Sequence, residues 1–177
     1  LNGQQLPPLL LLGAFVLLVL LNWNSLGERV PLYLSGQKTI AELAKLLQPL
    51  PANLRFIDLG CGLAGSLYQL SRRYPQAHFV GVETAPLVFL LAWLRCLLRP
   101  NCQIRYRNLW QQPLGDFDVV YCFLSPAPMP RLWAKACQEM RPGARLISNT
   151  FTIPGAPPDQ SIELHDWRSS RLLIWQR

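Results

Sequence analysis

The stretch that decides the fold is Phe56-Ile57-Asp58-Leu59-Gly60-Cys61-Gly62-Leu63-Ala64-Gly65. Its apolar start predicts a buried strand, its glycines predict a tight turn, and the apolar stripe that follows predicts a helix. A second apolar stretch, Phe79-Val80-Gly81-Val82-Glu83, ends in a carboxylate. A strand, a glycine turn, a helix and a second strand ending in an acid together form a unit that holds the adenosine part of a cofactor.

The acid Asp58, two residues before the first glycine, distinguishes between two classes of cofactor. Gly60, Gly62 and Gly65 match the dinucleotide pattern, and Glu83 lies near the expected position of a ribose-binding acid. A diphosphate would lie against the turn and the helix N-terminus, where a carboxylate opposes its charge. S-adenosylmethionine carries a positive ammonium and sulfonium, which an acid favours.

We therefore predict S-adenosylmethionine as the cofactor. A nicotinamide-dependent oxidoreductase fragment remains the alternative for the glycine pattern. A purely structural alternative for Asp58 is that its side chain only caps the following helix.

The rest of the chain predicts an α/β fold with a doubly wound, Rossmann-like and mostly parallel sheet. The expected strands are residues 54–59, 78–82, 103–107, 118–124 and 144–151. The expected helices are 37–48, capped by Ser35, then a helix that stops before Pro75, then 86–98 and 130–140. Residues 161–167 and 171–176 predict a terminal antiparallel hairpin. Five β-α repeats and this hairpin give seven strands.

The N-terminal residues 1–29 predict a hydrophobic membrane segment, followed by a single domain over residues 30–177. The run from Leu9 to Leu21 has no charged residue, and Trp23 suits a membrane interface. A cleaved signal segment and a buried core helix are the alternatives. Because lysine and arginine follow the run and none precedes it, we expect a single-pass or N-terminal anchor with the domain on the cytosolic side.

Charge and cysteine content restrict the partners. The five cysteines form no C-x-x-C pair, so we expect neither a metal site nor a disulfide framework. The net charge is +7, but the basic residues are scattered and form no aromatic-basic motif, so no nucleic-acid partner is expected. Attraction to anionic lipid and a merely solvated basic surface are equally good explanations of the charge. The oligomeric state is not specified.

The order of these motifs resembles the class I, seven-stranded S-adenosylmethionine-dependent methyltransferases over residues 30–177. Asp58, Gly60 and Gly62 match the first motif of that family, and Glu83 matches the acid that ends its second strand. Asn108-Leu109 matches the place where such enzymes hold the adenine ring. The cofactor site that the resemblance implies consists of Ser35, Asp58, Gly60, Cys61, Gly62, Glu83, Thr84, Asn108 and Leu109.

A narrower resemblance is to the membrane-anchored protein-lysine methyltransferases that include the ATP synthase c-subunit lysine N-methyltransferase. The similar stretches are 30–35, 58–62 and 108–110, whereas Ala64 stands where a glycine is usual. This resemblance implies a protein lysine near the membrane as the methyl acceptor. A lipid or small-molecule acceptor and a non-catalytic cofactor-binding module are the alternatives.

The acceptor side of the site has three candidate residues. Ligands of open α/β sheets lie at the carboxyl ends of the strands, which is where Ser125-Pro126 falls. Their carbonyls are candidates to orient an acceptor amine, although a rigid proline turn explains them equally well. Tyr33, together with Ser35, is expected to close over the cofactor from the linker. No residue is a convincing general base.

Overall fold

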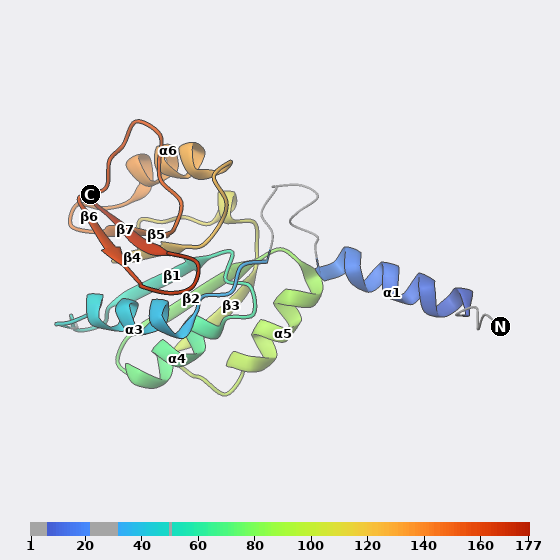
Figure 1. The fold of residues 1–177 in the computed structure, drawn as a ribbon. Helices are drawn as coiled ribbons and strands as arrows, with labels where there is room; N and C mark the ends of the chain where they lie inside the picture. The colour runs from blue at the N-terminus through green and yellow to red at the C-terminus, as the bar shows by residue number, and fades with distance from the viewer. Residues whose placement is uncertain (1–6, 22–31, 50) are drawn as a thin grey trace.

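The computed structural model describes residues 7–21, 32–49 and 51–177. In these residues one seven-stranded sheet has the order β3-β2-β1-β4-β5-β7-β6 (Figure 1). The strands are β1 (Arg55–Leu59), β2 (His78–Glu83), β3 (Cys102–Tyr106), β4 (Val119–Cys122), β5 (Arg145–Asn149), β6 (Gln160–Glu163) and β7 (Arg171–Gln176). Strands β1 to β5 pair in parallel, and β7 runs antiparallel to both β5 and β6. The predicted mostly parallel sheet with a terminal hairpin is therefore confirmed.

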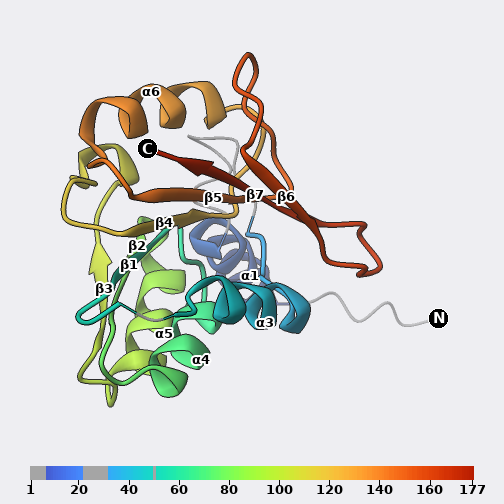
Figure 2. The same ribbon diagram turned by 90° about the vertical axis from the view of Figure 1, so that its left-hand side faces the viewer.

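Helices cover both faces of the sheet unequally. The helices are α1 (Pro8–Leu21), α3 (Gln37–Leu46), α4 (Gly65–Arg73), α5 (Pro86–Cys96), α6 (Met129–Glu139) and the 3-10 helix η1 (Leu109–Gln111). Helices α3, α4 and α5 lie on one face, and α6 lies on the other (Figure 2).

The expectation of five β-α repeats is wrong in detail. In the described part of the chain, α-helices follow β1, β2 and β4, but η1 follows β3 and a loop follows β5. Prolines explain both differences, because Pro113 and the run from Pro154 to Pro158 interrupt helical hydrogen bonding.

The central strands are buried on both faces, as their unbroken apolar sequence predicts. In β1, Phe56 packs into the core beneath α3 and α4, and the next residue, Ile57, packs into the core beneath α6. Trp175 of β7 closes the α6 side and donates its indole N–H to the Ala156 carbonyl at 3.0 Å. Alternation along each strand thus divides one apolar sequence between two cores.

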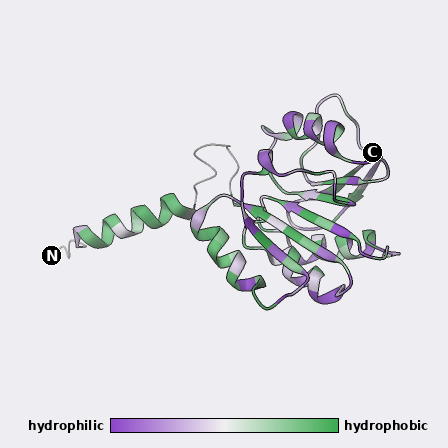
Figure 3. Ribbon diagram, turned by 180° about the vertical axis from the view of Figure 1, so that it is seen from behind, coloured by the Kyte–Doolittle hydropathy of each residue, from purple (hydrophilic) through white to green (hydrophobic). Residues whose placement is uncertain are grey.

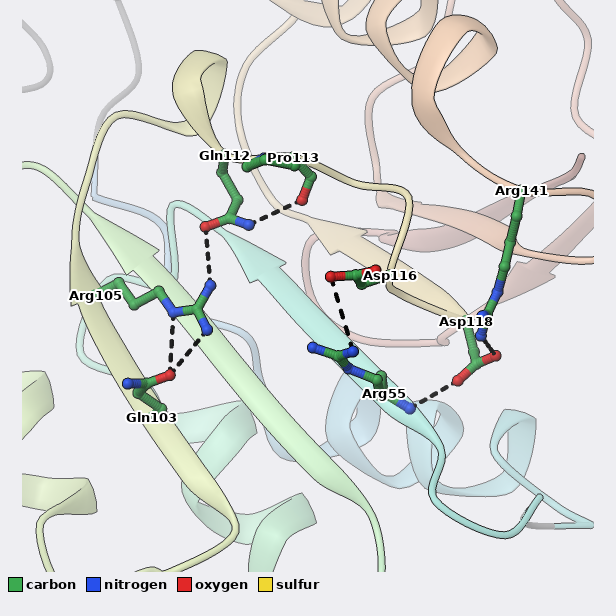
Figure 4. Close-up of polar contacts among 8 residues, drawn as sticks. All are labelled: Arg55, Gln103, Arg105, Gln112, Pro113, Asp116, Asp118 and Arg141. Atoms are coloured by element: carbon green, nitrogen blue, oxygen red, sulfur yellow. Dashed lines mark hydrogen bonds and ion pairs between the residues drawn. The ribbon is translucent and has the colours of Figure 1, made fainter.

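Charged contacts fasten the amino ends of the central strands (Figure 4). The carboxylate of Asp118 accepts the Arg55 backbone N–H at 2.8 Å and also pairs with Arg141. On the edge strand β3, the Arg105 guanidinium donates to the side-chain oxygens of Gln103 and Gln112. The Asp118 contacts lie at the opposite end of the central strands from the glycine turn, whereas Arg105 is level with Val82, near the carboxyl end of β3.

Two local predictions are corrected by the backbone. Ser35 does not cap α3: the N-cap residue is Gly36, without a side-chain cap. The hairpin strand β6 is shorter than residues 161–167, because His165 and Ser169 adopt positive φ angles of 47° and 50° in the turn. Left-handed conformations at two non-glycine residues end the extended backbone there.

The N-terminal hydrophobic segment forms α1, an apolar helix of 14 residues that packs against α5. It projects from the domain near the start of α5 (Figure 1), and its exposed leucines exclude the buried core helix. Such a helix is about 21 Å long, less than the ~30 Å bilayer core. Across residues 7–21, 32–49 and 51–177, no helix has the length and apolarity to cross a membrane. The spanning-helix prediction is therefore unsupported there; Trp23 lies outside the described residues.

Candidate functional site

The glycine turn after β1 is hydrogen-bonded to the end of β2. Gly60 and Gly62 adopt positive φ angles of 75° and 54°, a region that glycine enters without a steric cost. The N–H groups of Gly60 and Cys61 both donate to the Val82 carbonyl at 3.0 Å. The turn is therefore a fixed extension of the sheet.

Glu83 is a buried carboxylate that joins the glycine turn to the backbone between β2 and α5. It accepts the N–H of Gly62 at 3.1 Å, the N–H of Thr84 at 2.7 Å and the N–H of Ala85 at 2.9 Å. These bonds connect the glycine turn, the end of β2 and the start of α5. The hydrogen bonds that we predict from the ribose hydroxyls to the Glu83 carboxylate would add to this structural role.

Asp58 is the second buried carboxylate, at the neighbouring strand end. The Ser66 hydroxyl donates to its Oδ2 at 2.8 Å. Burial raises the pKa of Asp58 from 3.8 to about 7; the Ser66 hydrogen bond opposes this shift, and the nearby charge of Glu83 adds to it. The helix-cap alternative is wrong, because α4 has Ala64 as its N-cap and no side-chain cap.

A cavity of about 230 Å³ opens beside Asp58. Five predicted residues line it together, namely Tyr33, Ser35, Asp58, Gly60 and Cys61. The linker before α3 is held over this cavity by long-range contacts. The Tyr33 ring stacks on Phe123 with centroids 4.8 Å apart, and the Ser35 hydroxyl hydrogen-bonds the Tyr121 hydroxyl at 2.8 Å.

The other predicted residues do not line this cavity. Gly62, Glu83 and Thr84 form the hydrogen-bonded backbone described above. Asn108 caps η1, because its Oδ1 accepts the Trp110 N–H at 2.9 Å, and Leu109 is the first residue of η1.

Ser125 and Pro126, the candidates for the acceptor channel, follow β4. Ser125 is buried, and its hydroxyl has no hydrogen-bond partner within the described part of the chain. Pro126 is exposed. A buried hydroxyl without a partner is uncommon and favours a ligand role for Ser125, whereas Pro126 keeps only the predicted role.

A second depression, of about 340 Å³, adjoins the first and shares Leu34, Gln37 and Phe123 with it. The turn between β6 and β7 contributes Asp166 and Trp167 to its wall. Backbone N–H groups, that of Ser170 foremost, lower the pKa of Asp166, so this side chain is a carboxylate at neutral pH. The depression thus combines one acid and aromatic rings with two cations, Lys38 and Arg168.

Sequence reasoning missed several residues that line the first cavity. Ser66, the partner of Asp58, had a local signal, because it lies in the first turn of the helix after the glycines. Arg95 had none: it comes from α5 and donates to the Leu63 carbonyl at 2.9 Å, at the rim of the turn. Arg95 is a cation that can pair with a ligand carboxylate, opposite in charge to Asp58.

The hydrogen bonding of the turn disfavours a dinucleotide. A diphosphate is bound by free backbone N–H groups. Here the N–H groups of Gly60, Cys61, Gly62 and Ala64 all donate to acceptors within the protein. An acid with one observed hydrogen bond lines the cavity instead, and its free acceptor capacity fits the ammonium of S-adenosylmethionine.

Comparison with known proteins agrees with this geometry. The chain is 28% identical over 137 residues to the secondary metabolism regulator laeA of Monascus pilosus, covering 73% of this chain and 37% of that protein. It is 33% identical over 120 residues to the trans-aconitate 2-methyltransferase of Deinococcus radiodurans, covering 66% of this chain and 41% of that protein. The chain thus spans less than half the length of these relatives.

Solved structures share the fold. An RNA methyltransferase from Salinibacter ruber, in complex with S-adenosyl-L-homocysteine, has a TM-score of 0.72 at 18% identity, covering 81% of this chain and 93% of that chain. The Rossmann-like class I methyltransferase fold is confirmed, and the S-adenosylmethionine prediction is confirmed with it. A family model described as the ANTKMT methyltransferase domain matches residues 58–160, more than half of the chain. The protein therefore belongs to the ANTKMT methyltransferase domain family.

Proposed function

We propose that this protein is an S-adenosylmethionine-dependent methyltransferase that modifies a protein lysine near a membrane. The observation that carries the proposal is the buried carboxylate of Asp58, which lines the cavity beside a glycine turn in which the N–H groups of Gly60, Cys61 and Gly62 are already bonded. The family match supports methyl transfer. The resemblance to membrane-anchored lysine methyltransferases and the apolar helix α1 support the acceptor and its location.

The protein residues divide the work of binding the cofactor. Asp58 attracts the ammonium of the methionyl group, and Arg95 attracts its carboxylate, so the two ends of one zwitterion meet opposite charges. Gly62 lets the linker pack against the turn, since a Cβ at this position would lie 3.0 Å from Leu32 Cδ1. When bound, the cofactor supplies a methyl carbon on a positive sulfur, which is already activated toward a nucleophile.

The protein mainly has to align the acceptor with the methyl group and exclude water from it. Tyr33, Phe123 and Phe151 form an aromatic cluster beside the cavity, with ring centroids 4.8 to 6.2 Å apart. Apolar surroundings lower the pKa of a lysine ammonium, so the amine reaches the site without its proton. Ser125 is the candidate to orient that amine. Because the amine arrives without its proton, this mechanism requires no general base.

The adjoining depression is a suitable path for a cationic side chain. Asp166 offers a carboxylate and Trp167 an aromatic face, and Arg168 already places its guanidinium 4.6 Å from that ring centroid. Cation–π attraction of this kind favours a lysine or arginine over a neutral acceptor. A small-molecule acceptor is the second candidate, supported by the similarity to a trans-aconitate methyltransferase.

The test is transfer of a labelled methyl group from S-adenosylmethionine to membranes by the purified chain. We expect label in the protein fraction, located on lysine by mass spectrometry. Asp166→Asn and Trp167→Ala should slow protein labelling with unchanged cofactor affinity, and Arg171→Gln serves as a matched surface control on the same hairpin. Label confined to lipid or to small molecules would contradict a lysine acceptor. Cofactor binding without any label would instead indicate a binding module.

A further inference from the structure

Helix α5 buries one side and exposes an apolar one. Val88, Ala92 and Cys96 are buried on the side that faces the sheet. The outward side chains of α5 and the residues directly after it are between 41% and 87% exposed, and they are Leu90, Leu91, Trp93, Leu94, Leu97 and Leu98. A surface helix of a soluble domain normally presents polar residues on this side. An exposed apolar patch of this kind marks an interaction site.

This surface continues into α1. The two helices are packed against each other, and the side chains of α1 are largely exposed as well. Figure 3 shows both helices as hydrophobic ribbons that meet on one side of the domain. We call the six outward residues of α5 and its end, together with α1, the apolar flank.

The neighbourhood of the apolar flank is exclusively basic. Residues 84–115, which include α5 and the edge strand β3, contain no aspartate or glutamate and four arginines: Arg95, Arg99, Arg105 and Arg107. Within the described part of the chain, none of the four forms an ion pair. The Arg99 guanidinium lies 5.1 Å from the Tyr68 ring centroid, and Arg105 is held by the side-chain oxygens of two glutamines. Arg95 lines the cofactor cavity, and Arg105 lies on the opposite face of the sheet from Ile104, which packs on the α5 side, so Arg99 and Arg107 carry the charge that is available to an anionic partner.

We propose that the apolar flank rests on an anionic lipid bilayer, with α5 at headgroup depth and α1 beside it in the same surface. Apolar residues bordered by arginines, with Trp93 among them, match the layered chemistry of a bilayer interface. Each arginine near such a surface adds to the attraction between the flank and anionic lipid headgroups. The proposal rests on the membrane location given under the proposed function. It adds α5 as a second membrane contact beside α1, and it specifies that the lipid is anionic.

This placement determines where the cofactor cavity faces. Arg95 belongs to α5 and also lines that cavity, and exposed Leu34 lines both depressions. A domain that rests on α5 therefore holds the cavity close to the bilayer surface. An acceptor lysine would then be one that lies near the plane of the lipid headgroups.

The test measures how much of the full chain floats with phosphatidylcholine vesicles, with and without phosphatidylglycerol. Leu91→Gln/Leu94→Gln/Leu98→Gln should weaken binding by at least about tenfold. Trp167→Gln, which removes an 86% exposed apolar side chain at the opposite edge of the sheet, should not change it. Vesicle binding of the triple leucine variant and of the Trp167→Gln control is also measured in a Leu11→Gln/Phe15→Gln background, in which the contribution of α1 is reduced. Unchanged vesicle binding of the leucine variant in that background would overturn the proposal.

Charge is tested separately. Arg99→Gln/Arg107→Gln should weaken binding to anionic vesicles by about tenfold or more and leave neutral vesicles unaffected. Arg168→Gln/Arg171→Gln removes the same charge from the hairpin and should have the smaller effect. Equal effects of the two pairs would contradict a directed lipid contact.

Two further readouts separate the possible failures. Cofactor titration confirms that each variant is folded. If the leucine variant only dissociates a dimer, the flank binds a second copy and the lipid proposal is wrong. If the protein methylates a soluble lysine peptide but the variants bind vesicles as the unmodified protein does, the lipid proposal is wrong and the proposed function stands. If the protein binds vesicles as expected but transfers no methyl group, the proposed function is wrong and the lipid proposal stands.

Discussion

The ends of β1 and β2 each hold a buried carboxylate, but the two carboxylates have different surroundings. Glu83 accepts three backbone N–H groups and joins the glycine turn to α5. Asp58 accepts one hydroxyl, from Ser66, and faces the cavity. The comparison teaches that a similar acid at adjacent strand ends serves two purposes: Glu83 builds the site, and Asp58 keeps acceptor capacity for a ligand.

The largest expected effect comes from Glu83→Gln, because it replaces an oxygen that faces N–H donors with an amide NH₂. At least one buried N–H then loses its acceptor, which costs about 1–3 kcal/mol of stability. We expect cofactor affinity to fall by about a hundredfold, since the turn and the ribose contact change together. Urea unfolding and calorimetric titration measure the two effects. Normal stability with weakened binding would show that Glu83 acts on the ligand alone.

Asp58→Asn should separate binding from stability. The affinity for S-adenosylmethionine should fall by about tenfold or more, because a charge-assisted contact is lost. Stability at pH 8 should stay the same or rise, since a buried negative charge is removed. The same two measurements apply, with titration of NAD as a specificity control. Destabilisation at pH 8 would place Asp58 with Glu83 as a structural acid.

The pH dependence of binding follows from the raised pKa of Asp58. The folded-state pKa of about 7 lies above the ordinary value of 3.8, so the folded apo protein holds this proton more tightly than the unfolded chain. That contribution to stability is complete below pH 3.8 and is lost as pH rises through 7. A cationic ligand prefers the carboxylate, so affinity should rise about tenfold between pH 6 and pH 8. Asp58→Asn should abolish this rise; a rise that persists in the variant would assign it to another group.

The smallest effect is expected from Ala64→Gly, which changes the turn without touching either acid. Ala64 has a φ of 54°, in the left-handed region that glycine enters without a steric cost. Relieving this left-handed conformation should stabilise the protein by about 1 kcal/mol, detected by urea unfolding. Cofactor affinity should remain unchanged. A loss of affinity would show that the strain at Ala64 positions the turn for the ligand.

The comparison of the two acids also shows what the sequence alone predicts. The strand, the glycine turn and both carboxylates are coded within short segments, so their positions follow from local patterns. Local patterns do not predict which acid has its acceptor capacity filled, because Gly62 is 21 residues from Glu83 and Ser66 is 8 residues from Asp58. The sequence therefore predicts both acids as cofactor ligands without distinguishing their roles.

Contacts over long separations account for the rest. The linker is fixed by Ser35 bonding Tyr121, which are 86 residues apart, and by Tyr33 stacking on Phe123. Arg95 reaches the turn from an apolar helix whose sequence predicts only sheet packing. The depression at Asp166 depends on positive φ angles at His165 and Ser169 in the hairpin turn. Neither residue is a glycine, so the sequence does not predict a left-handed conformation there.

The most direct test of the central claim is a crystal structure of the full chain with S-adenosyl-L-homocysteine. We expect the ammonium of the ligand within hydrogen-bonding distance of the Asp58 carboxylate, while Glu83 keeps its bonds to the turn. A ligand that leaves Asp58 without contact, or that binds at another strand end, would show that Asp58 does not bind the cofactor.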